Sequence, residues 1–88
     1  MRFCIKIKGR VQGVYFRKFA QEKAVCLGLT GFVRNEPDGS VYTEAQGLAD
    51  QLEMFADWCG EGSPMSKVTS IEVSMKNDEP SECFEIRK

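Results

Sequence analysis

Apolar and polar residues alternate at the start of the chain. From Arg2 to Lys8, the side chains of Phe3, Ile5 and Ile7 fall on one face, and small or charged side chains fall on the other. A period of two residues is typical of a strand with one buried face. The pattern therefore predicts a first strand over residues 2–8.

A helical period follows after a glycine-rich break. Between Tyr15 and Leu27, the apolar positions Phe16, Ala20 and Leu27 share one stripe of a helix. Gly28 comes next, and a glycine just after the last helical residue commonly ends a helix in the left-handed conformation. We therefore expect a helix over residues 15–27 that ends at Gly28.

A second apolar stripe of helical period lies in the middle of the chain. Leu48, Leu52, Phe55 and Cys59 are spaced at i, i+4, i+7 and i+11, which is the pattern of an amphipathic helix. Because a glycine favours the end of a helix, we expect this one to close at Gly60.

The remaining apolar segments are typical of strands. Thr30–Asn35 and Ser40–Gln46 are rich in β-forming residues, and the Pro and Asp-Gly residues of segment 36–39 between them favour a tight turn, so a hairpin is expected. Lys67–Lys76 and Cys83–Arg87 are expected to form two further strands.

The order of these elements indicates the fold class. A βαββαβ order with right-handed crossovers is typical of an α+β ferredoxin-like sandwich, in which two helices cover one face of an antiparallel sheet. No repeat or linker interrupts the chain, so residues 1–88 are expected to form a single domain. The apolar residues on the inward faces are expected to form the core: Phe3, Ile5, Ile7, Phe16, Phe19, Leu27, Val33, Leu52, Phe55, Ile71, Val73, Phe84 and Ile86.

Composition narrows the class of partner. Twelve basic and 13 acidic residues leave a net charge of −1, which argues against nucleic acid or an anionic membrane as a partner. The chain has no run of 18 apolar residues, and its start alternates where a signal peptide would be continuously apolar. We expect a cytoplasmic protein and a monomer.

The cysteines do not suggest a metal site. Cys4, Cys26, Cys59 and Cys83 are widely separated, and the chain has no histidine to complete a zinc site. We expect no bound metal, and free thiols that mostly behave as small core residues. The even number of cysteines leaves a disulfide open as the alternative.

The segment from Gly9 to Arg17 is the strongest candidate for chemistry. It combines the end of a strand, a loop bracketed by Gly9 and Gly13, and the first turn of a helix. Backbone N–H groups at a helix N-terminus bind anions, and a glycine loop can curl around a phosphate. On residue types alone, a simple turn with Arg17 on a solvated helix face stays open as the alternative.

Two segments carry a resemblance to a known family. The segment Ile7–Arg17 (IKGRVQGVYFR) resembles the first signature of the acylphosphatase family, and Gly31–Val41 (GFVRNEPDGSV), continuing to Gly47, resembles the second. The similarity covers nearly the whole chain. Two positions vary within the family: Glu36 stands where some members carry a hydroxyl residue, and Tyr15 where the side chain is often smaller.

The resemblance implies a function and roles for particular residues. The substrate would be a small acyl phosphate, hydrolysed by direct attack of a water without cofactor, and inorganic phosphate or sulfate would bind the same loop. Arg17 would bind the phosphoryl group and Asn35 would orient the water. The phosphate cradle would be formed by the backbone of Val11, Gln12, Gly13, Val14, Tyr15 and Phe16.

The chemistry is compatible with so small a set of groups. A carboxylate is a good leaving group, since its conjugate acid has a pKa of about 4, so no general acid is needed. A non-catalytic module that binds anions on the same fold is the alternative, because a phosphate cradle serves binding as well as turnover.

Overall fold

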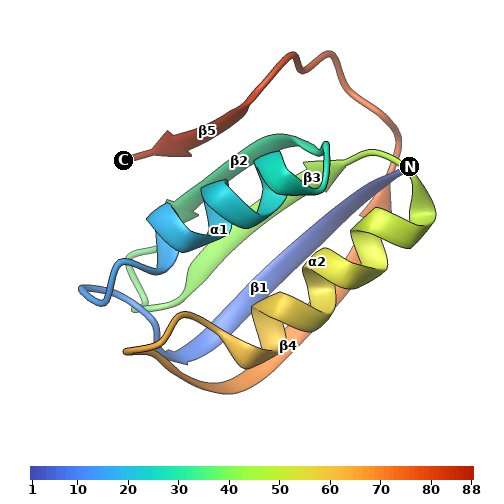
Figure 1. Cartoon of the computed structure of the whole chain (residues 1–88). Coiled ribbons are helices and arrows are strands. Elements are labelled where there is room, and N and C mark those ends of the chain that lie inside the picture. Colours follow the sequence, from blue (N-terminus) through green and yellow to red (C-terminus); the bar gives the residue numbers. More distant parts are fainter.

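Seven elements form the structure, which is a computed structural model describing residues 1–88. Figure 1 shows five strands in one sheet and two helices packed on the same face of it. In chain order the elements are β1 (Arg2–Arg10), α1 (Phe16–Cys26), β2 (Thr30–Asn35), β3 (Val41–Gln46), α2 (Ala49–Glu61), β4 (Lys67–Lys76) and β5 (Phe84–Arg87).

The strands lie in the order β4-β1-β3-β2-β5. The first four pair antiparallel with their neighbours, and the expected βαββαβ order and ferredoxin-like arrangement are confirmed. The last strand extends that order, because β5 pairs with the outer edge of β2 in parallel register, with Gly31 opposite Phe84. The sheet is therefore mixed and not wholly antiparallel as expected, and the C-terminal end of the chain lies beside the end of β2.

The core lies between the sheet and the helices. Because side chains alternate along a strand, Ile5 and Ile7 of β1 face the helices, where they meet Phe16 of α1 and Phe55 of α2. All four are at most 1% exposed. The cluster also contains Val11 and Val14, from the loop before α1, and Leu29, from the segment after it. The periodic patterns in the sequence did not identify these three residues.

Three residues expected in the core are exposed. Phe19 is 38%, Val73 45% and Ile86 41% exposed. Val73 and Ile86 lie on β4 and β5, which are the two edge strands, and helices cover an edge less completely than the centre of a sheet. Phe19 lies on the helix stripe only approximately, three residues after the buried Phe16.

The two helices end differently from one another. Helix α1 ends as expected, with Gly28 at φ 72°, and the N–H groups of Gly28 and Leu29 donate to the carbonyls of Val25 and Ala24, a Schellman motif. The expectation for α2 is wrong by two residues. The helix continues through Gly60 to Glu61, and the residue with positive φ is Gly62.

The cysteines are all free thiols, but only Cys59 is buried in the core. Cys4 is half-buried on the sheet, and Cys26 and Cys83 are exposed, so the expectation that most are core residues is wrong. No three His, Cys, Asp or Glu side chains gather closely enough to hold a metal ion. Neither helix has the length and apolar character needed to span a membrane.

Candidate active site

The loop between β1 and α1 turns through two left-handed residues. Gly13 has φ 74° and Tyr15 has φ 61° and ψ 22°. Tyr15 is the single non-glycine residue with positive φ, a conformation that costs an L-residue about 1–2 kcal/mol. Such strain persists where the surrounding structure enforces it, and it is common at binding sites.

This turn leaves a row of backbone donors without partners. No hydrogen bond within the protein uses the six N–H groups from Gly13 to Lys18, and the first helical bond is donated by Phe19 to the carbonyl of Tyr15 at 3.1 Å. No side chain caps the start of α1. A left-handed residue followed by helical ones directs successive N–H groups into one concavity, and the positive end of the helix dipole adds to it. The loop is therefore receptive to an anion.

The loop opens into a pocket of about 360 Å³. This pocket brings together Arg17 from α1 and Asn35 from the end of β2, which lie 18 positions apart in the sequence. Two of the lining residues are basic and none is acidic. The lining residues are Val11, Gly13, Tyr15, Phe16, Arg17, Lys18, Asn35 and Ile86.

Two of the eight residues with expected roles lie outside this lining. The Gln12 side chain turns away from the pocket, and its Nε2 donates to the carbonyls of Glu36 and Ser40 at 2.8 Å each. Val14 is buried, and its carbonyl accepts a hydrogen bond of 3.2 Å from the Ser63 hydroxyl. Gln12 thus ties the loop to the turn that follows Asn35, and Val14 ties it to the segment after α2.

Arg17 is held from the C-terminal strand. Its Nη1 donates to the backbone carbonyl of Arg87 at 3.0 Å. It forms no ion pair, whereas Lys6, Lys8 and Arg34 each pair with a carboxylate. Of the two cations that line the pocket, Lys18 lies 3.9 Å from Glu22, so Arg17 is the one without a carboxylate partner.

The contribution of β5 was missed in the sequence. Ile86 was expected in the core but lines the pocket, and a backbone carbonyl such as that of Arg87 leaves no mark in a sequence.

The β2–β3 turn sets the position of Asn35. The turn is closed by hydrogen bonds, with Glu36 N donating to Ser40 O at 2.9 Å and Ser40 N donating to Asp38 Oδ1 at 3.0 Å. The hydrogen bonds from the hydroxyl and the N–H of Ser40, joined by Lys6, hold the pKa of Asp38 well below its usual range. Asp38 is therefore charged throughout the physiological range and stabilises the turn.

Glu36, which directly follows Asn35, does not place its charge in the pocket. Its carboxylate accepts from Arg34 at 3.3 and 3.4 Å, and Glu36 is absent from the pocket lining. An acid at this position is therefore compatible with an anionic ligand.

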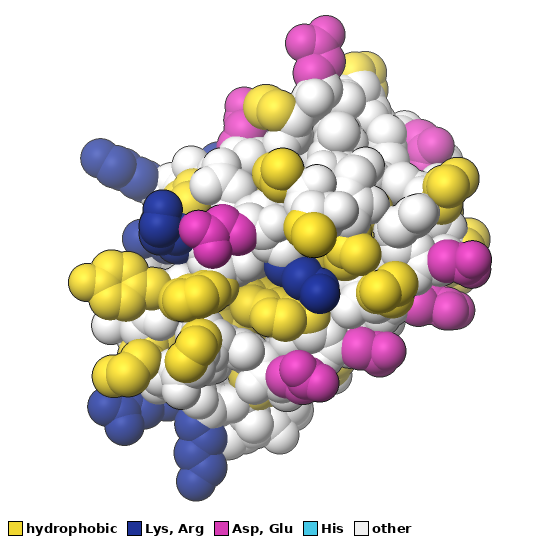
Figure 2. Space-filling model, in the orientation of Figure 1, with side chains coloured by type: hydrophobic (Ala, Val, Ile, Leu, Met, Phe, Trp, Pro, Cys, Tyr) yellow, Lys and Arg dark blue, Asp and Glu magenta, His cyan; other side chains and the backbone are white.

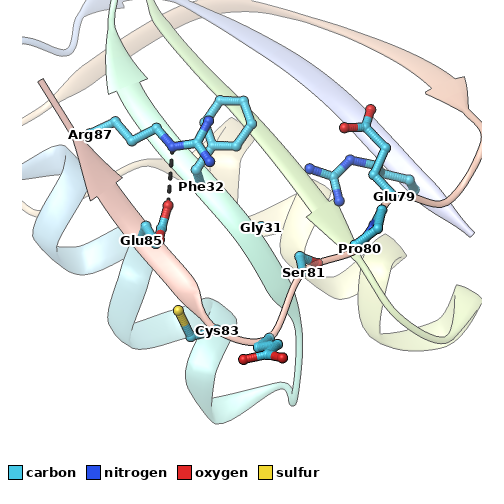
Figure 3. A pocket seen from close by; sticks show the side chains of 10 residues that line it. Gly31, Phe32, Glu79, Pro80, Ser81, Cys83, Glu85 and Arg87 are labelled. Carbon is cyan, nitrogen blue, oxygen red and sulfur yellow. Dashed lines mark hydrogen bonds and ion pairs between the residues drawn. The ribbon is translucent and has the colours of Figure 1, made fainter.

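A second hollow, of about 410 Å³, has a different character. Figure 3 shows it between β5, β2 and the segment before β5, with Arg87 bonded to Glu85 and lying over the ring of Phe32 at 4.0 Å. Its lining holds three glutamates, Glu79, Glu82 and Glu85, and two arginines, each of which is already paired with a carboxylate: Arg2 with Glu44 and Arg87 with Glu85. These carboxylates would repel a phosphoryl group, so the pocket beside the loop is the candidate active site.

The fold and the pocket define a small α+β protein in which an arginine and an amide side chain line one pocket beside a loop with unpartnered backbone N–H groups. The comparisons with known proteins agree with that class. The model of the acylphosphatase family matches residues 3–86, and the chain belongs to this family.

Close relatives span the whole chain. An acylphosphatase from Shewanella amazonensis is 51% identical over 83 residues, which are 94% of this chain and 89% of the relative. The crystal structure of acylphosphatase from Bacillus subtilis has a TM-score of 0.95 at 40% identity, covering 99% of this chain and 98% of that one. An acylphosphatase structure from Coxiella burnetii has a TM-score of 0.94 at 32% identity, covering 98% and 90%. The family and the class of enzyme expected from the sequence are confirmed.

Proposed function

We propose that the protein hydrolyses the carboxyl-phosphate bond of acyl phosphates by direct in-line attack of a water, with Arg17 and Asn35 as the catalytic side chains. The proposal rests on one observation: Arg17 and Asn35 line the same pocket, and the loop with the unpartnered N–H groups opens into it.

The loop and Arg17 would hold the phosphoryl group. Its oxygens carry negative charge, and the N–H groups from Gly13 to Lys18 offer donors at the positive end of α1. The guanidinium of Arg17 presents paired donors that match two phosphoryl oxygens. These donors stay aimed at the oxygens as their charge redistributes through the transition state, so they stabilise it without reorganising.

Asn35 would orient the attacking water. Its amide both accepts and donates hydrogen bonds, so it fixes a water without adding charge next to the phosphate. A carboxylate there would repel the substrate. The departing carboxylate needs no proton at neutral pH, because its conjugate acid has a pKa of about 4. The site therefore needs only positioning and electrostatic stabilisation.

The test is hydrolysis of benzoyl phosphate by the purified protein in excess EDTA. We expect turnover by the wild-type protein, a loss of about 100-fold or more in kcat/KM for Arg17→Ala, and a fall mainly in kcat for Asn35→Ala. Arg10→Ala is the matched control, since Arg10 lies at the end of β1 outside the pocket lining. Folding of each variant is checked by its unfolding midpoint.

Two results would contradict this proposal. If folded wild-type protein produced no phosphate above the spontaneous rate, the chain would be an anion-binding module on this scaffold. If Asn35→Ala kept the wild-type kcat, Asn35 would not orient the water. Inorganic phosphate or sulfate is expected to inhibit competitively by binding the same loop.

The cytoplasmic location, the monomeric state and the single domain over residues 1–88 stay predictions from the sequence.

A further inference from the structure

Two large apolar side chains at the candidate active site are exposed. Tyr15 is 73% and Ile86 41% exposed, and both line the pocket that contains Arg17 and Asn35. Figure 2 shows hydrophobic side chains gathering at the end of the molecule where the loop before α1 lies, with basic side chains nearby. Exposed apolar groups beside a polar binding site commonly contact the ligand.

Both side chains are presented by well-defined backbone. Tyr15 is the left-handed residue at the start of α1, so its backbone conformation fixes the direction of its Cα–Cβ bond. Ile86 lies in β5 in register with Val33 of β2, and it therefore projects to the helix side of the sheet, as Val33 does. The two residues come from separate elements that meet at the pocket.

The covalent structure of an acyl phosphate places its acyl group in this pocket. The acyl carbon is joined to phosphorus through one bridging oxygen, so a phosphoryl group held by the loop and Arg17 brings the acyl group against the rest of the lining. Apart from Gly13, Asn35 and the two basic residues, that lining is Val11, Phe16, Tyr15 and Ile86. Val11 and Phe16 are each 1% exposed. Tyr15 and Ile86 are therefore the lining residues whose apolar surface is accessible to the acyl group.

The charges nearby do not favour a second anionic group. Lys18 is the remaining cation in the lining, and its ammonium lies 3.9 Å from the carboxylate of Glu22 on the next turn of α1. Arg17 would be occupied by the phosphoryl group. No further unpaired cation lines the pocket to hold a carboxylate on the acyl portion.

We propose that Tyr15 and Ile86 form an acyl-binding wall, which makes acyl phosphates with an aromatic or bulky apolar acyl group the preferred substrates. The inference rests on the proposed function, since it assigns the second half of the same substrate. Stacking on the Tyr15 ring and burial against Ile86 remove apolar surface of the acyl group from water, which lowers KM for larger acyl groups.

The experiment compares kcat/KM for benzoyl, acetyl and succinyl phosphate. We expect the wild-type protein to favour benzoyl over acetyl phosphate by about tenfold or more, the effect of a few buried carbon atoms. The variants Tyr15→Asn and Ile86→Thr should each reduce that ratio about three- to tenfold. Asparagine tolerates positive φ, and threonine keeps the β-branch of the strand.

Matched controls separate the apolar surface from general damage. Tyr15→Phe and Ile86→Val keep an apolar surface and should keep the benzoyl-to-acetyl ratio. Met65→Gln alters an equally exposed apolar residue, 68% exposed and outside the pocket lining, and should leave the ratio unchanged. The inhibition constant of inorganic phosphate, which has no acyl group, reports on the phosphate cradle alone.

Three outcomes would overturn the inference. A benzoyl-to-acetyl ratio that is the same in wild type, Tyr15→Asn and Ile86→Thr would show that neither side chain contacts the acyl group. A preference for succinyl over benzoyl phosphate would indicate that Lys18 binds a carboxylate on the acyl group. If no acyl phosphate were hydrolysed, the proposed function itself would fail, whereas hydrolysis of acetyl phosphate with an unchanged ratio removes only the acyl-binding wall.

Discussion

Gln12 connects the two halves of the candidate active site through one amide group. Its Nε2 donates to the carbonyls of Glu36 and Ser40, which flank the turn after Asn35. Each carbonyl also accepts a backbone hydrogen bond, from Gly39 N and Glu36 N respectively. Removing the amide therefore leaves neither carbonyl unpaired. We infer that Gln12 sets the position of Asn35 relative to the loop.

A double-mutant cycle tests this positioning role. Gln12→Ala should lower kcat about tenfold with a small change in KM, because a slight displacement of a positioned water costs rate more than binding. In an Asn35→Ala background the same substitution should have almost no further effect on kcat. Gln21→Ala is the control, since Gln21 makes a similar bond of 2.9 Å to the Phe84 carbonyl but lies outside the pocket lining. Equal effects of Gln12→Ala in both backgrounds would mean that it acts independently of Asn35.

At the scale of the element, the glycines of the two helices have opposite roles. Gly28 ends α1 with φ 72°, and no atom lies within 4 Å of the point that a β-carbon would occupy there. Gly60 lies inside α2, where a β-carbon would make an ordinary contact with Ile71 at 3.9 Å. Gly28 is required because few other residues adopt its left-handed conformation, whereas Gly60 lowers the stability of α2 because glycine is a poor helix former.

Alanine substitutions should separate these roles. Gly28→Ala should destabilise the fold by about 1 kcal/mol, because alanine is strained in the left-handed conformation. Gly60→Ala should stabilise it by about 0.5–1 kcal/mol, because alanine loses less conformational entropy in a helix. Urea unfolding midpoints measure both changes. Two shifts of the same sign would contradict the helix ends described above.

Prediction from sequence worked best for elements with a strong period. The bounds of β2 and β4 agree with the expected segments, and the α1 stripe correctly identified Phe16 and Ala20 as buried. The end of α2 was misplaced, because Gly60 and Gly62 are equally good terminators in a sequence and only tertiary packing distinguishes them. Phe19 was assigned to the core because it lies close to the apolar stripe of α1, but it is 38% exposed.

The candidate site was predictable in part. Arg17 and Asn35 were identified through the family resemblance, and the structure lines one pocket with both. The bond from Arg17 to the Arg87 carbonyl and the place of Ile86 at the pocket depend on the parallel pairing of β5 with β2. Such a pairing between distant segments leaves no periodic signal in either of them.

At the scale of the whole molecule, a buried charged cluster joins three strands on the face of the sheet away from the helices. The carboxylate of Glu44 accepts from Arg2 Nε and from the Tyr42 hydroxyl, both at 2.7 Å, and Lys76 lies at 3.2 Å. Burial raises the pKa of Glu44, but the hydrogen bonds from Tyr42, Arg2 and Lys76 outweigh it and hold the pKa below its usual value. The cluster thus joins β1, β3 and β4 through one carboxylate.

This cluster predicts how stability depends on pH. Because the folded-state pKa of Glu44 is below the unfolded value of about 4.3, its contribution is complete above that value and is lost as the pH falls through the folded pKa. The urea midpoint should therefore be level from pH 7 to about 5 and fall below about 4. Glu44→Gln should cost about 3 kcal/mol at pH 7, since it leaves the buried Arg2 charge without its counter-ion.

Glu72→Gln is the control for this prediction. Glu72 is exposed and lies 3.7 Å from Lys8, and an ion pair of that kind contributes only about 0–1 kcal/mol. If Glu44→Gln were no more destabilising than Glu72→Gln, or if it left the acid limb of the stability curve unchanged, the buried cluster would not be an important source of stability.

The unpartnered N–H groups from Gly13 to Lys18 affect how this enzyme can vary over evolutionary time. They belong to the main chain, so no codon change deletes one of them except a change to proline. A side chain that makes no contact of its own can therefore change without removing a donor, because the N–H groups depend on the backbone conformation. Because alanine keeps the main-chain N–H, an alanine scan reports on side chains such as those of Gln12 and Arg17, whereas a proline scan removes one N–H at a time and reports on the backbone donors.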